Sequence, residues 1–199
     1  MIIDEHKFIF VHLRKTGGTS VQDFFTGDSD VSKEPGNKHF EPKDYYRDSP
    51  KKWNDYFKFS FVRNPFCFLV SYYNFRMRMM NGELGRVELF MNEEYKNSCF
   101  EEWIKERFFG DPRIRPQVEQ LSINNKIAVD FIGRFENLQE DFNIVCDKIG
   151  IPQQQLPHKN KTKHKHYTEY YDDETRQIVA EKYAKDIKYF GYKFGEFGK

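Results

Sequence analysis

The sequence predicts an α/β fold in which a central parallel sheet is flanked by helices, within a single domain over residues 1–199. Short apolar segments typical of buried strands alternate along the chain with longer segments typical of helices. A length of 199 residues suits one domain. A hydrophobic content of 38% with 18% aromatic residues indicates a globular protein with an aromatic-rich core.

Three apolar segments are expected to form strands, and each ends at a polar turn: residues 7–13 (KFIFVHL), 56–62 (YFKFSFV) and 128–133 (AVDFIG). Segments typical of helices follow each strand or stand near the C-terminus: a helix that begins with residues 21–25 (VQDFF), and helices over residues 68–80, 138–149 and about 172–187. Strands that alternate with helices favour parallel pairing.

Local signals indicate where these helices begin and end. Thr19 and Ser20 offer hydroxyl caps to the helix that follows the first strand. Gly150 is a natural end for the helix over residues 138–149. Residues 28–55 are polar and contain several prolines, so we expect little regular structure there.

Charge and cysteine content limit the possible partners. The formal net charge is only +1, so no global field attracts nucleic acid or a membrane, and an anion site must be built locally. Cys67, Cys99 and Cys146 are widely spaced, which favours buried free thiols over a zinc or redox site. No signal peptide or transmembrane segment is recognisable, so a cytoplasmic location is expected.

The most informative segment is residues 14–20 (RKTGGTS), between the first strand and its helix. Its two glycines allow successive backbone N–H groups to converge on an anion. The helix start adds N–H groups and the positive end of a dipole. Lys15 supplies a mobile charge, and the threonines and serine supply hydroxyl donors. The segment predicts a cradle for a compact tetrahedral anion.

The order of residues separates this cradle from known ATP-binding loops. A Walker A loop carries its lysine after the last glycine, whereas Lys15 precedes Gly17 and Gly18. A dinucleotide GxGxxG motif is also absent from this turn. The loop is therefore P-loop-like but of a different kind.

Four segments together resemble the sulfotransferases that use PAPS (adenosine 3′-phosphate 5′-phosphosulfate), particularly the branch of heparan 2-O- and chondroitin-type enzymes and their small bacterial relatives. HLRKTGGTS resembles the 5′-phosphosulfate loop, and FVRNPFCFLVSYY resembles the 3′-phosphate motif. IGRFENLQEDF resembles the block after the third strand, and YFGYKF resembles the family's C-terminal ending. The segments stand in the family's order and cover most of the chain.

The resemblance implies a P-loop-like sulfotransferase fold and transfer of a sulfuryl group from PAPS to a hydroxyl, less often an amine, of a glycan or small molecule. Adenosine 3′,5′-bisphosphate would be the product, and no metal is expected. Lys15 would contact the oxygen that bridges phosphorus and sulfur. The residues implied in 5′-phosphosulfate binding are Arg14, Lys15, Thr16, Gly17, Gly18, Thr19 and Ser20.

Arg63 and Ser71 would bind the 3′-phosphate by the same resemblance. Arg63 follows the carboxyl end of a predicted strand, where ligands bind in open α/β sheets. Its planar fork also matches phosphate oxygens better than a lysine would. The sequence departs from the family at residues 66–68 (FCF), where an acid and an arginine are common, so no second basic contact is expected from this helix.

The basic segment 157–166 (PHKNKTKHKH) has two interpretations. By composition it is a solvated loop. By the resemblance, Lys161, Thr162 and Lys163 form a clamp over the nucleotide. Its histidines lack companion cysteine or acidic ligands, so a metal site is not expected there.

A general base is needed to accept the proton of the acceptor hydroxyl. His39 corresponds to a base histidine in the resembling branch, and an ordinary imidazole suits this task at neutral pH. His12 is the nearest rival, although its place in the strand indicates a structural role beneath the loop. Gln117 falls where the branch has a Pro-Gln near the acceptor, but a buried capping amide is equally consistent with the sequence.

Two other functions remain open from the sequence alone. A small-molecule or nucleotide kinase would need a Walker A lysine, which is missing from this loop. It would also need an acidic metal ligand at the end of a strand, for which Asp130 is the one weak candidate in the sequence. A non-catalytic nucleotide-binding module would keep Arg63 and the glycine loop but would not need Lys15 or His39.

Overall fold

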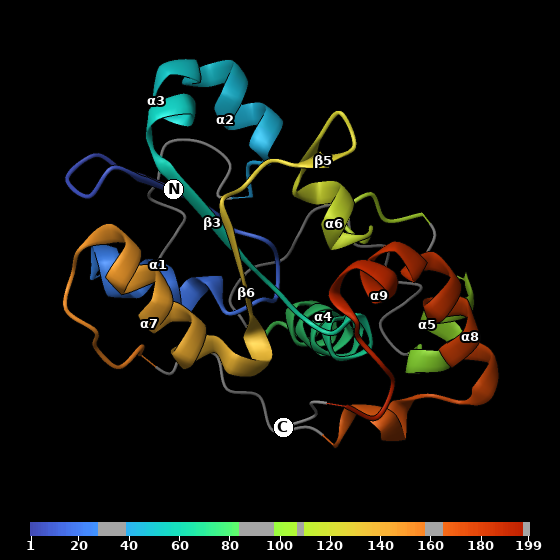
Figure 1. Ribbon diagram of the computed structural model, residues 1–199. Helices are drawn as coiled ribbons and strands as arrows, with labels where there is room; N and C mark the ends of the chain where they lie inside the picture. Colours follow the sequence, from blue (N-terminus) through green and yellow to red (C-terminus); the bar gives the residue numbers. More distant parts are fainter. Residues whose placement is uncertain (28–38, 84–97, 107–109, 158–164, 197–199) are drawn as a thin grey trace. The chain divides into compact units, whose positions relative to one another are not determined.

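The computed structural model describes residues 1–27, 39–83, 98–106, 110–157 and 165–196 (Figure 1). The chain divides into two compact units. Each unit combines two stretches of chain: Met1–Arg63 with Gln117–Lys163, and Asn64–Pro116 with His164–Lys199. A single domain over residues 1–199 therefore stays a prediction.

The first unit contains a four-stranded sheet in the order β1-β2-β3-β6. Its strands are β1 (Ile2–Ile3), β2 (Phe8–Val11), β3 (Phe57–Val62) and β6 (Phe131–Arg134). β2, β3 and β6 are parallel, and the short β1, which the sequence did not indicate, pairs with β2 in the antiparallel direction. The predicted α/β class with a parallel sheet is confirmed.

The register of the parallel strands decides where a site can form. Val11 of β2 lies opposite Ser60 of β3, and Val62 of β3 lies opposite Arg134 of β6. The segments that leave the carboxyl ends of these strands therefore emerge at one edge of the sheet. Ligands of open α/β sheets bind at this edge.

Alternating side chains of the strands build the core of the first unit. Phe8, Phe10, Phe59 and Phe61 are completely buried and cluster with apolar residues of α1 (Gly18–Thr26) and α7 (Leu138–Ile149). The two helices lie side by side in Figure 1, and rings of Phe24 and Phe142 touch between them at a centroid distance of 4.9 Å. The remaining elements of this unit are α2 (Pro42–Asp48), α3 (Pro50–Asp55), α6 (Gln117–Gln120), η3 (Phe135–Asn137) and the hairpin of β4 (Ser122–Ile123) and β5 (Lys126–Ile127).

Two local predictions for this unit were wrong. The expectation of little regular structure over residues 28–55 fails at α2 and α3, because Pro42 and Pro50 occupy the first position of a helix, where proline is favoured. Residues 28–38 lie outside the described part of the chain. The helix α1 starts at Gly18 after a left-handed Gly17 (φ 84°), and the Thr19 and Ser20 hydroxyls do not cap it.

The second unit is helical: α4 (Pro65–Met80), α5 (Phe100–Glu106), η4 (Tyr167–Tyr170), α8 (Asp173–Lys182) and α9 (Ala184–Phe190). An aromatic-rich cluster with Phe68, Trp103 and Tyr183 forms its core. The single helix predicted over residues 172–187 is two helices, because Tyr183 leaves the helical conformation (φ −100°, ψ 20°) with its ring fully buried.

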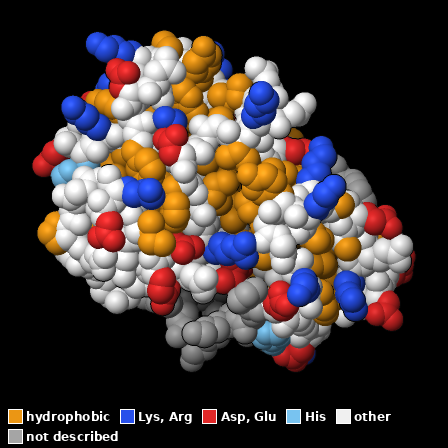
Figure 2. Space-filling view, in the orientation of Figure 1, with side chains coloured by type: hydrophobic (Ala, Val, Ile, Leu, Met, Phe, Trp, Pro, Cys, Tyr) orange, Lys and Arg blue, Asp and Glu red, His pale blue; other side chains and the backbone are white. Residues whose placement is uncertain are grey.

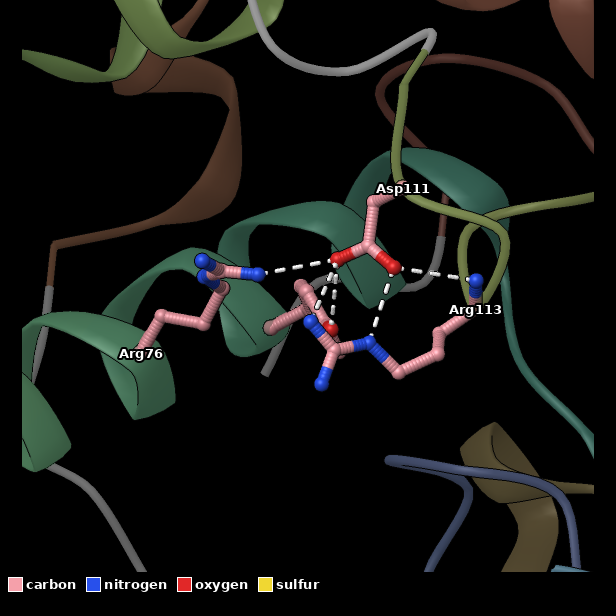
Figure 3. A network of polar contacts seen from close by, with 4 residues as sticks. Arg76, Asp111 and Arg113 are labelled. Carbon is pink, nitrogen blue, oxygen red and sulfur yellow. Dashed lines mark hydrogen bonds and ion pairs between the residues drawn. The ribbon is translucent and has the colours of Figure 1, made fainter. Parts of the chain in front are cut away.

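A half-buried carboxylate holds a loop of this unit to α4 (Figure 3). Asp111 accepts a hydrogen bond from Arg76 at 2.8 Å and from Arg113 Nε at 2.8 Å, and the Tyr72 hydroxyl donates to it at 3.0 Å. Burial raises the pKa of Asp111, but hydrogen bonds from Arg113 more than offset this, so the pKa lies below its ordinary value. The ionised carboxylate therefore stabilises the folded unit.

Asn64 of the Arg-Asn-Pro motif connects the start of α4 with the C-terminal segment of the same unit. Its side-chain oxygen accepts from the N–H of Phe66 at 3.1 Å and caps the helix. Its Nδ2 donates to the carbonyl oxygens of Lys193 at 3.0 Å and Glu196 at 3.3 Å. The motif and the C-terminal ending noted in the sequence are thus in direct contact.

The three cysteines are free thiols, and Cys67 and Cys146 are buried as predicted. The prediction was wrong for Cys99, which is exposed because it stands immediately before α5. No helix in the described part of the chain is long and apolar enough to cross a membrane.

Candidate functional site

The candidate site begins with the turn between β2 and α1. Lys15 and Gly17 both have left-handed backbones, with φ of 60° and 84°. The Thr16 hydroxyl donates to the carbonyl of Leu13 at 3.0 Å and closes the turn from within. The turn therefore lies at the carboxyl edge of the sheet, directly before the N-terminus of α1.

Close packing explains why the two glycines are needed. A Cβ on Gly17 would stand 2.7 Å from Cδ2 of Leu138 and 3.2 Å from Cδ2 of Phe135. A Cβ on Gly18 would overlap the imidazole of His12. Because a side chain at either position would collide with these neighbours, glycine is needed for the turn to pack against His12, Phe135 and Leu138.

The backbone N–H groups at this helix start can serve an anion. Ser20 N–H bonds to the carbonyl of Gly17 at 3.0 Å, as the first intrahelical donor. Helix geometry gives the preceding N–H groups of Gly18 and Thr19 no intrahelical acceptor. Such groups, with the helix dipole, attract phosphate and sulfate.

Arg63 follows the last residue of β3 and is only 8% exposed. Its Nη1 donates to the carbonyl oxygen of Lys15 at 3.3 Å. Its Cζ lies 4.0 Å from the centroid of the Phe135 ring, a distance typical of a cation–π contact. The guanidinium group is thus beside the glycine turn, at the same edge of the sheet.

Gln117, the first residue of α6, holds the backbone of Arg63 with both ends of its amide. Its Oε1 accepts from the Arg63 N–H at 2.9 Å, and its Nε2 donates to the Arg63 carbonyl at 2.7 Å. The side chain is 1% exposed. These two bonds fix the point at which β3 ends.

His39 lies beside the end of β2. Its Nδ1 is 3.0 Å from the carbonyl oxygen of His12, and the two imidazole centroids are 4.9 Å apart. A carbonyl oxygen can only accept a hydrogen bond, so Nδ1 carries the proton and the neutral ring keeps its lone pair at Nε2. This tautomer can accept a proton at Nε2. His12 itself is buried and stacks on Phe10, which agrees with the structural role expected for it.

The other residues of the predicted site lie in different parts of the chain. Ser71 is half-buried in α4 of the second unit. Lys161, Thr162 and Lys163 lie outside the described residues. Arg14, half-buried, stands in the turn itself.

Asp130, the possible metal ligand of a kinase, stands at the other edge of the sheet, before β6. It accepts from the Lys58 N–H at 2.7 Å and pairs with the Lys58 ammonium at 3.0 Å. Within the described residues, no cluster of three or more histidine, cysteine or acidic side chains could hold a metal.

Two residues that shape this site, Phe135 and Leu138, were not predicted to belong to it. Both belong to the segment IGRFENLQEDF, which follows β6 and packs against Gly17. An aromatic residue directly after a parallel strand indicates that Phe135 lies at this edge of the sheet, but no sequence signal indicates its contact with Arg63 or the position of Leu138 against Gly17.

A glycine turn before a helix, with an arginine at the next strand end, defines an α/β protein with the elements of a phosphate-type anion site at the carboxyl edge of its sheet. Comparison with known proteins gives the family. Residues 1–193 match the profile of the Sulfotransferase family, and the chain belongs to that family.

The chain is also 34% identical over 104 residues to an uncharacterized protein of Archaeoglobus fulgidus. That alignment covers 52% of this chain and 76% of the archaeal protein. No solved structure matches the chain.

Proposed function

We propose that the protein transfers a sulfuryl group from PAPS to a hydroxyl of a glycan or small molecule and releases adenosine 3′,5′-bisphosphate. The observation that carries this proposal is the contact between Arg63 and the carbonyl of Lys15. The donor bears two anionic groups on one ribose, so its site needs two anion-binding elements side by side. The glycine turn and Arg63 meet that requirement.

The residues present fit such a donor. Because Gly17 and Gly18 have no Cβ, the turn can pack tightly against Phe135, Leu138 and His12. In this proposal the backbone N–H groups at the start of α1 bind the 5′-phosphosulfate. The Arg63 fork suits a 3′-phosphate, which it can bind through two parallel hydrogen bonds. Ser71, Arg14 and the segment of Lys161, Thr162 and Lys163 are proposed as further donor contacts, by resemblance to the family.

Two side chains supply the chemistry in this proposal. The Lys15 ammonium offsets negative charge on the 5′-phosphate oxygen as its bond to sulfur breaks. His39 Nε2 takes the proton of the acceptor hydroxyl as that oxygen forms its bond to sulfur. As in phosphoryl transfer, in-line positioning and charge stabilisation carry the catalysis.

The surface charge favours an acceptor that is small or weakly charged. The net charge is +1, and on the face drawn in Figure 2 lysine and arginine side chains are interspersed with acidic and apolar ones. A strongly anionic polymer would be bound best by a broad basic surface. We therefore propose a neutral glycan or a small hydroxylated molecule as acceptor.

Thermal unfolding with added nucleotides tests the donor. Adenosine 3′,5′-bisphosphate at about 100 times its Kd should raise Tm by roughly 5–10 °C, the shift that mass action gives for a protein of this size. Stronger stabilisation by ATP with magnesium would reject the proposal in favour of a kinase.

Transfer itself needs a second assay, with ³⁵S-labelled PAPS and a panel of hydroxylated acceptors. Labelled product identifies the acceptor class. Stabilisation by the bisphosphate without transfer to any acceptor, and without hydrolysis of the donor, would indicate a binding module in place of an enzyme.

A further inference from the structure

Phe135, the residue that follows β6, contacts both anion-binding elements of the proposed site. Its ring centroid lies 4.0 Å from Cζ of Arg63. On the other side, its Cδ2 would stand 3.2 Å from a Cβ placed on Gly17. One aromatic ring therefore supports both the arginine and the glycine turn.

The surroundings of Phe135 argue against a role in core packing alone. The ring is half-buried, whereas Leu138 packs against the core of the first unit. Its face is occupied by a guanidinium group. A cation held over an aromatic ring is attracted by the negative face of that ring.

Gln117 supports Arg63 at its backbone, whereas Phe135 contacts the end of its side chain. Its amide fixes the N–H and the carbonyl of Arg63 at 2.9 and 2.7 Å, while Phe135 holds the end of the side chain. A free arginine side chain has many rotamers, and restricting it to one of them on binding costs conformational entropy, which lowers the affinity. A guanidinium that is already oriented before binding avoids most of that loss.

We infer that Phe135 and Gln117 are positioning residues, which hold Arg63 so that its fork faces the 3′-phosphate of the donor. This inference rests on the proposed function, because it assumes that Arg63 binds that phosphate. It gives the segment IGRFENLQEDF a specific task in donor recognition. By this inference Gln117 acts on donor binding, because it holds Arg63, and does not contact the acceptor.

The test compares two ligands that differ only in the 3′-phosphate: adenosine 3′,5′-bisphosphate and adenosine 5′-phosphate. Affinities are measured by calorimetry for the wild type and for Phe135→Leu, which removes the aromatic face but keeps an apolar side chain. We expect Phe135→Leu to lower the affinity for the bisphosphate about fivefold to tenfold, which is the range of a partly buried cation–π contact. The affinity for the monophosphate should change by less than about twofold. Phe135→Tyr, which keeps the aromatic face, should bind both ligands with wild-type affinity.

Phe57→Leu is the matched control, because Phe57 stands at the start of β3 and Arg63 follows its end. This control should bind both ligands as the wild type does. In an Arg63→Ala background, Phe135→Leu should have no further effect on the bisphosphate, because the two side chains act as one unit. Gln117→Glu, which cannot donate to the Arg63 carbonyl, should repeat the selective loss and gives a second test if Phe135→Leu does not fold.

Equal weakening of both ligands, or a loss that persists in the Arg63→Ala background, would overturn the inference. So would unchanged affinity for the bisphosphate in Phe135→Leu. These results differ from a failure of the proposed function, in which the wild type itself would bind the bisphosphate no better than the monophosphate.

Discussion

The imidazole of His12 occupies the space into which a side chain on Gly18 would project. His12 follows β2 and Gly18 begins α1, so this contact sets how closely the turn lies against the sheet. We expect Gly18→Ala to displace the turn and weaken binding of adenosine 3′,5′-bisphosphate by at least about tenfold, since overpacking a tight site costs about 1–3 kcal/mol. Calorimetry measures this loss, and wild-type affinity in the variant would contradict the packing described here.

Gly27→Ala is the control for that substitution. Gly27 also has a positive φ, 65°, but no atom lies within 4 Å of a Cβ placed there. We expect it to lower the free energy of unfolding by about 1 kcal/mol through backbone strain and to leave donor affinity unchanged. Urea titration measures the first quantity and calorimetry the second.

Lys15→Ala should lower kcat about 100-fold to 1,000-fold while the protein stays folded, because the leaving oxygen then lacks its cation. Lys7→Ala is the matched control: Lys7 also has a positive φ, 48°, but precedes β2 at the other edge of the sheet. Initial rates with ³⁵S-labelled donor compare the two variants. A Lys15→Ala enzyme with wild-type kcat would exclude the lysine from the chemical step.

His39→Ala should lower kcat/KM about 100-fold or more and leave donor affinity unchanged, because the base acts on the acceptor. In the wild type, kcat/KM should fall on acidification, since protonation removes the lone pair at Nε2. His6→Ala, which changes a histidine before β2, should retain the wild-type profile. Full turnover in the His39 variant would remove this residue from the mechanism.

Asp111→Asn should lower the free energy of unfolding by about 1–3 kcal/mol at pH 7, because it weakens the hydrogen bonds that Arg76 and Arg113 donate to a charged, partly buried group. The pKa of Asp111 is lowered in the folded state, so its contribution is complete above the unfolded pKa of about 3.9 and is lost as pH falls through the folded value. The wild type should therefore lose more stability than the variant between about pH 5 and pH 3. Urea denaturation across this range measures the difference, and parallel curves for the two proteins would contradict the assignment.

Local signals were sufficient for much of the fold. The apolar strands β2 and β3 and the helix α7, which ends at a left-handed Gly150, follow from residue type and spacing alone. The glycine turn was also recognisable, because a conformation with positive φ favours glycine. The helices α2 and α3 were not predicted, because their prolines were interpreted as ending regular structure, whereas proline can also begin a helix.

The supports of Arg63 could not be predicted in the same way. Phe135 and Gln117 reach Arg63 from elements distant in the sequence, and no spacing rule relates an arginine to an aromatic ring after another strand. The role of Gln117 depends on two hydrogen bonds to backbone atoms, which any residue except proline could offer at position 63. Such contacts follow from the tertiary structure and not from the side-chain pattern.

A crystal structure of the protein with adenosine 3′,5′-bisphosphate is the most direct test of the central claim. We expect the 5′-phosphate against the backbone N–H groups of Gly18 and Thr19, with the Lys15 ammonium beside it, and the 3′-phosphate on the fork of Arg63. A nucleotide bound elsewhere, or bound here with Lys15 and Arg63 both directed away from its phosphates, would contradict the account.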